Sequence, residues 1–262
     1  MKKKPLISVI MNCYDGEKYL KKSLQSLKKQ TYSNWELIFW DNVSKDNSKK
    51  IFDKLKDKRF FYFKSKKFLN LYDARNQAIK KSKGKYVCFL DVDDLWKKNK
   101  LRTQVNFMNK NKMFKIIYSN FYVILEKKNK TFIKYKKGSL PYGFITQKLL
   151  NEYSVGILTT MINKKMFKSF KFNGKYNIIG DFDFIIRSSL RFKIGCIQEP
   201  LAYYRIHTSN YSINRRKLHI YELSRWILDN KKIAKKFSLS LKTIKKQIFK
   251  LKIKSYLRFL GM

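Results

Sequence analysis

The chain of 262 residues is 44% hydrophobic, enough to bury the core of one large domain or of one domain with appendages. Its formal net charge of +43 comes from 61 lysines and arginines against 18 aspartates and glutamates, and indicates either an anionic partner or a general bias toward lysine. The lysines run from Lys2 to Lys254 without one compact patch, which favours the bias, and no apolar stretch approaches the ~20 residues of a membrane-spanning helix.

Strand and helix patterns alternate through the first 90 residues. The predicted strands span 6–11, 35–40, 59–63 and 86–90, and the predicted helices span 17–30, 44–55 and 73–81. This alternation is typical of a parallel, doubly wound sheet with helices on both faces. Ligands of such sheets bind beyond the carboxyl ends of the strands.

After about residue 111 the pattern changes. Further strands are predicted at 116–122, 131–135, 158–162 and 202–206, with a helix at 181–192. From His219 onward two helices are predicted, and lysines surround the apolar residues of the second, which run from Leu241 to Leu260. Two interpretations of the last helix stay open: it packs on the domain, or it lies on an anionic lipid surface as a basic amphipathic helix.

Three carboxylates, Asp91, Asp93 and Asp94, directly follow the strand at 86–90. Like charges this close repel each other unless a cation lies between them. Carboxylate oxygens at this spacing suit Mg²⁺ or Mn²⁺, which commonly bridge to phosphate oxygens. The sequence therefore predicts a metal-diphosphate site at the carboxyl end of the sheet. Polar groups also follow the first two strands, at 12–15 and 41–42, and we expect them at the same cleft.

With these elements in order, the chain resembles glycosyltransferase family 2. The matching stretches are 7–20, 30–42, 46–48, 74–76, 84–94, 180–183 and 203–207. The resemblance covers about residues 5–210 and implies an α/β protein of the GT-A fold, with a Rossmann-like, mostly parallel central sheet, flanking helices and a C-terminal helical extension. It divides the chain into a nucleotide-sugar-binding half (1–111), an acceptor-binding half of the same domain (112–218) and basic amphipathic helices (219–262).

The resemblance also implies roles for residues that bind the donor. Asp41 would hydrogen-bond the nucleobase, commonly uracil, although an acid at this position can also serve only as a turn or helix cap. Arg75 would approach the nucleotide, Asp91 would face the ribose or the metal shell, and Arg205 would support the phosphates. The donor-binding set is completed by Asn12 and Tyr14 after the first strand.

The metal and the proton-accepting base are assigned in the same way. Asp93 matches the metal-binding acid, with Asp91 and His207 as further metal ligands and Asp94 as an alternative. Asp181 matches the general base, and Asp183 is the alternative because Gly180 stands where relatives usually have glutamate. Both acids could instead serve only to stabilise the start of a helix.

The implied activity is inverting transfer of a sugar from a UDP-sugar, with Mn²⁺ or Mg²⁺, to a glycan or polyprenyl-linked acceptor in cell-surface polysaccharide biosynthesis. Segments 136–156 and 164–180 would shape the acceptor pocket, with Tyr142, Tyr153 and Trp226 as stacking partners. A nucleic-acid-binding protein is the alternative that the charge suggests. However, the sequence contains no recognisable nucleic-acid-binding module, and we do not expect nucleic acid as a partner. A nucleotidyltransferase is disfavoured because no glycine-rich basic loop follows the first strand.

The cysteines bear on location. Cys13, Cys88 and Cys196 lie in apolar segments at spacings that suit neither a disulfide nor a metal site, as is typical of a reducing compartment. Too few apolar residues follow the basic residues 1–5 for a signal peptide. The prediction is a cytoplasmic protein, with the inner face of the cell membrane as a docking surface for the C-terminal helices.

Overall fold

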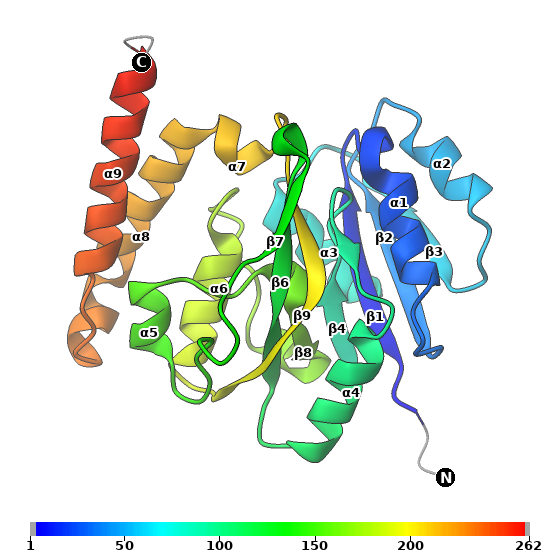
Figure 1. Cartoon of the computed structure of the whole chain (residues 1–262), viewed down its shortest axis with the longest axis horizontal. Coiled ribbons are helices and arrows are strands. Elements are labelled where there is room, and N and C mark those ends of the chain that lie inside the picture. Colours follow the sequence, from blue (N-terminus) through cyan, green and yellow to red (C-terminus); the bar gives the residue numbers. More distant parts are fainter. Residues whose placement is uncertain (1–3, 260–262) are drawn as a thin grey trace.

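The structure is a computed structural model that describes residues 4–259 (Figure 1). Its strands are β1 (Ile7–Cys13), β2 (Trp35–Asp41), β3 (Phe60–Lys64), β4 (Tyr86–Phe89), β5 (Leu95–Trp96), β6 (Ile116–Leu125), β7 (Lys130–Ile133), β8 (Met161–Asn163) and β9 (Ile194–Ile206). They form one sheet in the order β3-β2-β1-β4-β8-β6-β9-β5, and β7 pairs with β6 outside that path. Helices cover both faces of the sheet (Figure 1).

The first half of the sheet is parallel, as predicted. Helices α1 (Glu17–Lys28), α2 (Ser48–Lys54) and α3 (Leu71–Lys81) connect β1 to β4 in turn. Along β1, Val9 and Met11 face the core that includes α1, whereas Ile10 faces the core that includes α3. A strand alternates its side chains in this way, so both faces are buried and only the strand ends are open to a ligand.

Helix α2 begins later than the predicted helix at 44–55, because the residues before it form a turn. The backbone N–H of Ser44 donates to the carboxylate of Asp41 over 2.7 Å. The backbone N–H of Ser48 donates in the same way to Asp46 over 2.9 Å. This turn fixes Asp41 at the carboxyl end of β2.

The second half of the sheet is mixed. The parallel pair β6 and β9 is flanked by the short antiparallel partners β8, β7 and β5. Strand β9 is longer than the predicted strand at 202–206 and contains Pro200, which the ladder accepts because the register shifts around Asn120. A short 3₁₀ turn, Ile157–Thr159, replaces the start of the predicted strand at 158–162.

Helices α4 (Lys100–Lys110), α5 (Thr146–Asn151) and α6 (Gly180–Ser189) complete the domain. Strand β5 and helix α4 were not predicted. The buried residues of α4, Leu101, Val105 and Met108, follow helical spacing. Helix α6 confirms the predicted helix at 181–192 and places Asp181 and Asp183 in its first turn.

The chain ends in helices α7 (Tyr211–Asn214), α8 (Arg216–Lys236) and α9 (Lys242–Phe259). Trp226 of α8 and Ile244 and Ile248 of α9 are buried in the core that also holds α6, so both helices pack on the domain. Leu260, which was expected to widen the apolar face of the last helix, lies outside the described residues. Among residues 4–259 we find no helix with the length and hydropathy needed to cross a bilayer.

Lys100 at the start of α4 is fully buried. Its ammonium group donates to the side-chain oxygen of Gln104 over 2.6 Å and lies 4.1 Å from the centre of the Trp96 ring. Burial disfavours the charged form and lowers the pKa of Lys100 from 10.5 to about 8. The unfolded chain therefore binds the proton more tightly than the folded one does.

We expect the free energy of unfolding to rise between pH 8 and pH 10.5 by up to about 3 kcal/mol on account of Lys100. This contribution is fully present above the unfolded pKa and is lost as the pH falls toward the folded one. Denaturant titrations at several pH values should show the rise in wild type and in Lys98→Met, an exposed control, but not in Lys100→Met. An unchanged slope in Lys100→Met would contradict the prediction.

Candidate active site

A cavity of about 400 Å³ lies beyond the carboxyl end of β4. Five of the predicted site residues line it together: Arg75 from α3, Asp91, Asp93 and Asp94 from the loop after β4, and Asp181 from α6. Tyr153, one of the predicted stacking residues, also lines this cavity. Residues more than 100 positions apart in the sequence therefore meet at the edge of the sheet that the strand pattern indicated.

Arg75 and Asp91 form an ion pair that faces the cavity. The guanidinium group donates to the two carboxylate oxygens of Asp91 over 2.8 and 3.1 Å. The side chain of Arg75 is 3% exposed, and that of Asp91 is 33% exposed. The guanidinium carbon lies 5.4 Å from the ring centre of Tyr72 and 5.6 Å from that of Phe89. Arg75 is thus a fixed positive charge on the cavity wall, with Asp91 reaching into the open space.

Asp93 contacts the predicted metal ligand His207. The Nε2 atom of His207 lies 2.9 Å from a carboxylate oxygen of Asp93, and Nδ1 lies 3.1 Å from the hydroxyl of Ser209. The ring of His207 packs against Tyr19, with 4.6 Å between the ring centres. Burial, and next the neighbouring charge of Asp91, raise the pKa of Asp93.

We call residues 91–94, which carry three carboxylates, the acidic loop. Arg205 contacts this loop from outside the cavity. Its backbone N–H donates to the carboxylate of Asp94 over 2.9 Å, and its Nε donates to the carbonyl of Asp93 over 2.9 Å. Asp94 is buried, and burial raises its pKa well above the usual value of an aspartate. Arg205 and His207 do not line the cavity, so both reach it only through the loop they contact.

Asp181 and Asp183 are neighbours on α6 but lie in different surroundings. Asp181 lines the cavity, accepts from the backbone N–H of Phe182 over 2.8 Å and lies 3.2 Å from the hydroxyl of Tyr72. Burial raises the pKa of Asp181, and the positive charge of Arg75 opposes that shift. A carboxylate with a raised pKa is a better proton acceptor near neutral pH.

Asp183 turns away from the cavity. Its carboxylate pairs with Arg187 over 2.8 Å and accepts from the indole N–H of Trp226 over 3.0 Å. Trp226 is 2% exposed. This burial leaves no free ring face for a ligand, contrary to the stacking role expected of Trp226. Tyr142 is 69% exposed and lies outside this cavity.

Glu222 of α8 does not line the cavity but holds the segment that leads into it, and the sequence analysis did not single it out. Its carboxylate accepts from the backbone N–H groups of Asn177, Ile178 and Ile179 over 2.6, 2.9 and 3.1 Å. These residues lead directly into α6 and Asp181. The sequence offers one signal that could have indicated Glu222. It is one of the two acids, with Asp229, in the otherwise basic segment from His219 to Met262.

The predicted donor-binding residues of β1 and β2 lie at the same edge of the sheet but not in the cavity. Asp41 is buried and accepts from the hydroxyl of Tyr62 as well as from Ser44. Asn12 has buried side-chain amide atoms with no hydrogen-bond partner among the described residues. Tyr14 is 51% exposed.

The acidic loop fits a divalent metal that arrives with a nucleotide. No three His, Cys, Asp or Glu side chains in the described part of the chain are grouped so that they alone could hold an ion. Mg²⁺ and Mn²⁺ need only one or two protein carboxylates when phosphates complete the shell. The oxygens of Asp93 and Asp91 provide that number at the cavity wall.

Comparison with known proteins places this site in a family. The family model described as Glycosyl transferase family 2 matches residues 8–192. The chain belongs to this family. An uncharacterized glycosyltransferase of Methanocaldococcus jannaschii is 31% identical over 237 residues, which are 87% of this chain and 81% of that protein. The UDP-Glc:alpha-D-GlcNAc-diphosphoundecaprenol beta-1,3-glucosyltransferase WfaP of Escherichia coli is 30% identical over 221 residues, 81% of this chain and 82% of that protein.

Solved structures show the fold of this family 2 glycosyltransferase. TarS of S. aureus in complex with UDP matches with a TM-score of 0.66 at 20% identity, over 83% of this chain and 65% of that one. The mannosyltransferase PcManGT of Pyrobaculum calidifontis with GDP-Man and Mn²⁺ matches with a TM-score of 0.63 at 12% identity, over 86% of this chain and 65% of that one. The chain thus spans about two thirds of each solved chain. The fold is GT-A, as predicted.

Proposed function

We propose that the protein transfers a sugar from a UDP-sugar to an acceptor hydroxyl with inversion at the anomeric carbon. The observation that carries the proposal is the shared cavity, where Arg75, Asp91 and Asp93 face the same space as Asp181. Asp91 and Asp93 supply carboxylates for a divalent cation, and Arg75 supplies a positive charge for the diphosphate. Asp181 supplies a proton acceptor. Uracil is the proposed base because a carboxylate such as Asp41 can accept from its N–H group.

The proposed reaction is a direct displacement. The acceptor oxygen forms a bond to the anomeric carbon while the bond from that carbon to the β-phosphate oxygen breaks. UDP leaves with the electron pair, and the hydroxyl proton passes to a carboxylate oxygen of Asp181. Attack from the face opposite the leaving group inverts the anomeric centre. A bound divalent cation would neutralise the charge that grows on UDP.

Residues toward the donor have distinct tasks in this proposal. Asp93, supported by His207, would hold the cation, and Asp91 would face the cation or the ribose. Arg75 would balance the diphosphate charge from the cavity wall. Arg205 would act by fixing the acidic loop, and Asn12, Tyr14 and Asp41 would bind the nucleoside at the ends of β1 and β2.

A thermal-shift screen of nucleotides with and without Mn²⁺ tests the donor and the metal together. We expect UDP or a UDP-sugar to raise the melting temperature more with Mn²⁺ than without it. Asp93→Asn should abolish that extra increment, whereas Asp53→Asn on the exposed face of α2 should keep it. No stabilisation by any nucleotide, or the full Mn²⁺ increment in Asp93→Asn, would contradict the proposal.

The acceptor is proposed to be a glycan or polyprenyl-linked sugar of a cell-surface polysaccharide. The name of the E. coli relative, which includes a diphosphoundecaprenol acceptor, supports this class. A lipid-linked acceptor would bring the enzyme to the membrane surface, and we propose that it works there as a peripheral protein on the cytoplasmic face.

Helix α9 offers a surface for that contact. One side packs into the core through Ile244 and Ile248, while Phe249, Ile253 and Tyr256 are 64%, 43% and 64% exposed among exposed lysines. Apolar side chains within a basic face are typical of a helix at an anionic lipid surface. Of the two interpretations that the sequence left open, packing on the domain is what the structure shows, and contact of the opposite side with lipid is our proposal.

Substitution of Phe249, Ile253 and Tyr256 by serine should reduce sedimentation of the protein with vesicles that contain phosphatidylglycerol, because the apolar contacts with the bilayer are lost. The same substitutions should leave the thermal shift with UDP and Mn²⁺ unchanged. Undiminished sedimentation of the triple variant would contradict a lipid contact through α9.

A further inference from the structure

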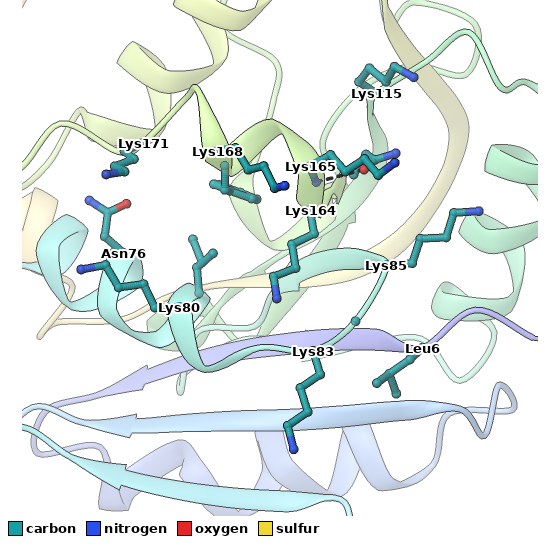
Figure 2. Close-up of a pocket in the computed structure, with 14 residues that line it drawn as sticks. Leu6, Asn76, Lys80, Lys83, Lys85, Lys115, Lys164, Lys165, Lys168 and Lys171 are labelled. Carbon is teal, nitrogen blue, oxygen red and sulfur yellow. Dashed lines mark hydrogen bonds between the residues drawn. The ribbon is translucent and has the colours of Figure 1, made fainter.

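A second cavity, of about 770 Å³, lies at the opposite edge of the sheet from the candidate active site. Eight of its fourteen lining residues are lysines, and the lining contains no aspartate or glutamate. Lysine makes up 51 of the 262 residues of the chain, so a compositional bias alone predicts about three in fourteen. We call this surface the lysine hollow (Figure 2).

The lysines converge because of the sheet register and not because they are consecutive. The backbone N–H of Asn163 donates to the carbonyl of Lys115, and that of Lys164 donates to the carbonyl of Lys85. Lys115, Lys164 and Lys85 lie just outside β6, β8 and β4, whose ends meet here. Figure 2 shows further lysines on two sides of the hollow, Lys80 and Lys83 on one and Lys165, Lys168 and Lys171 on the other.

The charges of the lysine hollow are not neutralised within residues 4–259. None of its eight ammonium groups has a carboxylate within 4.0 Å in that range, and all of the lysines except half-buried Lys164 are exposed. The ammonium group of Lys164 donates to the carbonyl of Ser82. The nearby buried Glu36 accepts from the backbone N–H groups of Lys83 and Gly84 and from the hydroxyl of Ser8.

The shape of the hollow strengthens its field. Leu6, Ile79 and Phe167 contribute apolar side chains to the lining. A concave surface of one charge sign with apolar walls focuses the electric field and concentrates counter-ions. One phosphate would fill only a small part of this volume. The lysines that surround the hollow come from separate segments of the chain. These features favour an anion that carries several charged groups.

We propose that the lysine hollow binds a ligand with several phosphate groups. Compact ammonium groups on flexible stems suit phosphate oxygens without demanding one fixed geometry. The hollow is not the donor site: Lys85 precedes β4 and Asp91 follows it, a separation of roughly 20 Å at 3.3 Å per residue. Its ligand comes either from solution or from the headgroups of an anionic bilayer.

Calorimetric titration of the full chain with tripolyphosphate, in the presence of EDTA, tests the site. We expect saturable binding that weakens at higher salt. Changing Lys80, Lys83, Lys165 and Lys168 to glutamine should weaken the affinity at least tenfold. The control changes Lys21, Lys22, Lys50 and Lys54 of α1 and α2 to glutamine, removes the same charge from exposed positions and should weaken it less than twofold. No saturable binding by wild type, or equal losses in both variants, would overturn the proposal.

Two further measurements assign the source of the ligand and separate this proposal from the proposed enzyme activity. If the hollow variant also loses binding to phosphatidylglycerol vesicles while the control variant keeps it, the ligand is a lipid headgroup. If only tripolyphosphate affinity is lost, the ligand is a soluble anion. Both variants should keep the wild-type thermal shift with UDP and Mn²⁺, because the donor site is at the other edge of the sheet.

Discussion

Replacement of Asp181 by asparagine should lower kcat by about 10²- to 10⁴-fold, because the proposed base can no longer accept the acceptor proton. The amide oxygen can still accept from the N–H of Phe182, and the change removes a charge that burial disfavours. The melting temperature should therefore stay the same or rise. Turnover with the donor identified by thermal shift, measured together with nucleotide binding, tests the prediction.

Asp183→Asn is the matched control, because it makes the same chemical change two residues away. Its carboxylate contacts Arg187 and Trp226 inside the fold, so its loss should cost about 1 to 3 kcal/mol of stability. Turnover by the folded variant should stay within a few fold of wild type. Full turnover by Asp181→Asn, with a stable but inactive Asp183→Asn, would assign the base to Asp183 instead.

Replacement of Glu222 by alanine should lower the free energy of unfolding by about 3 kcal/mol or more. Three backbone N–H groups would lose their acceptor, and each such loss costs at least about 1 kcal/mol. Because these groups belong to the segment that leads into Asp181, kcat should also fall about 10- to 100-fold at a temperature where the variant is still folded. Denaturant titration and turnover measure the two effects.

Asp229→Ala is the control for this change, since Asp229 is the other acid of α8. Its side chain is 32% exposed and pairs with Arg225 one turn away, a contact worth less than about 1 kcal/mol. Glu222→Gln should fall between the two, because the amide keeps one acceptor oxygen but loses the charge. If folded Glu222→Ala turns over at the wild-type rate, α8 supports the fold without positioning Asp181.

The parallel half of the sheet and the cavity acids could be predicted because their signals are local. Buried strands such as 86–90 are short apolar runs, and a group of acids at the end of such a run is rare enough to indicate a site. The order of the strand ends then fixes which of them meet. Asp91 and Asp93 were chosen on that basis, and Asp181, assigned through the family resemblance, lines the same cavity.

Other features depend on contacts between distant residues, and local patterns do not reveal them. Nothing around Glu222 indicates that its carboxylate holds backbone groups 45 residues earlier. Helix α4 was missed because its first residue, Lys100, is a buried lysine where an exposed one is the usual expectation. Gln198, Glu199 and Pro200 interrupt the apolar pattern of β9, and pairing with β6 overrides that interruption.

The hold of Glu222 on the loop before α6 has a consequence for how the protein is made. Ribosomes add about 5 to 20 residues per second, so this loop leaves the ribosome seconds before Glu222, which accepts its hydrogen bonds. Strands β1 to β4 pair with one another and all precede this loop in the chain, so they can assemble during that interval. Nascent chains that stop before α8 should therefore have a folded N-terminal half, up to residue 111, but no catalytic activity. They should also expose apolar surface that cellular proteases recognise.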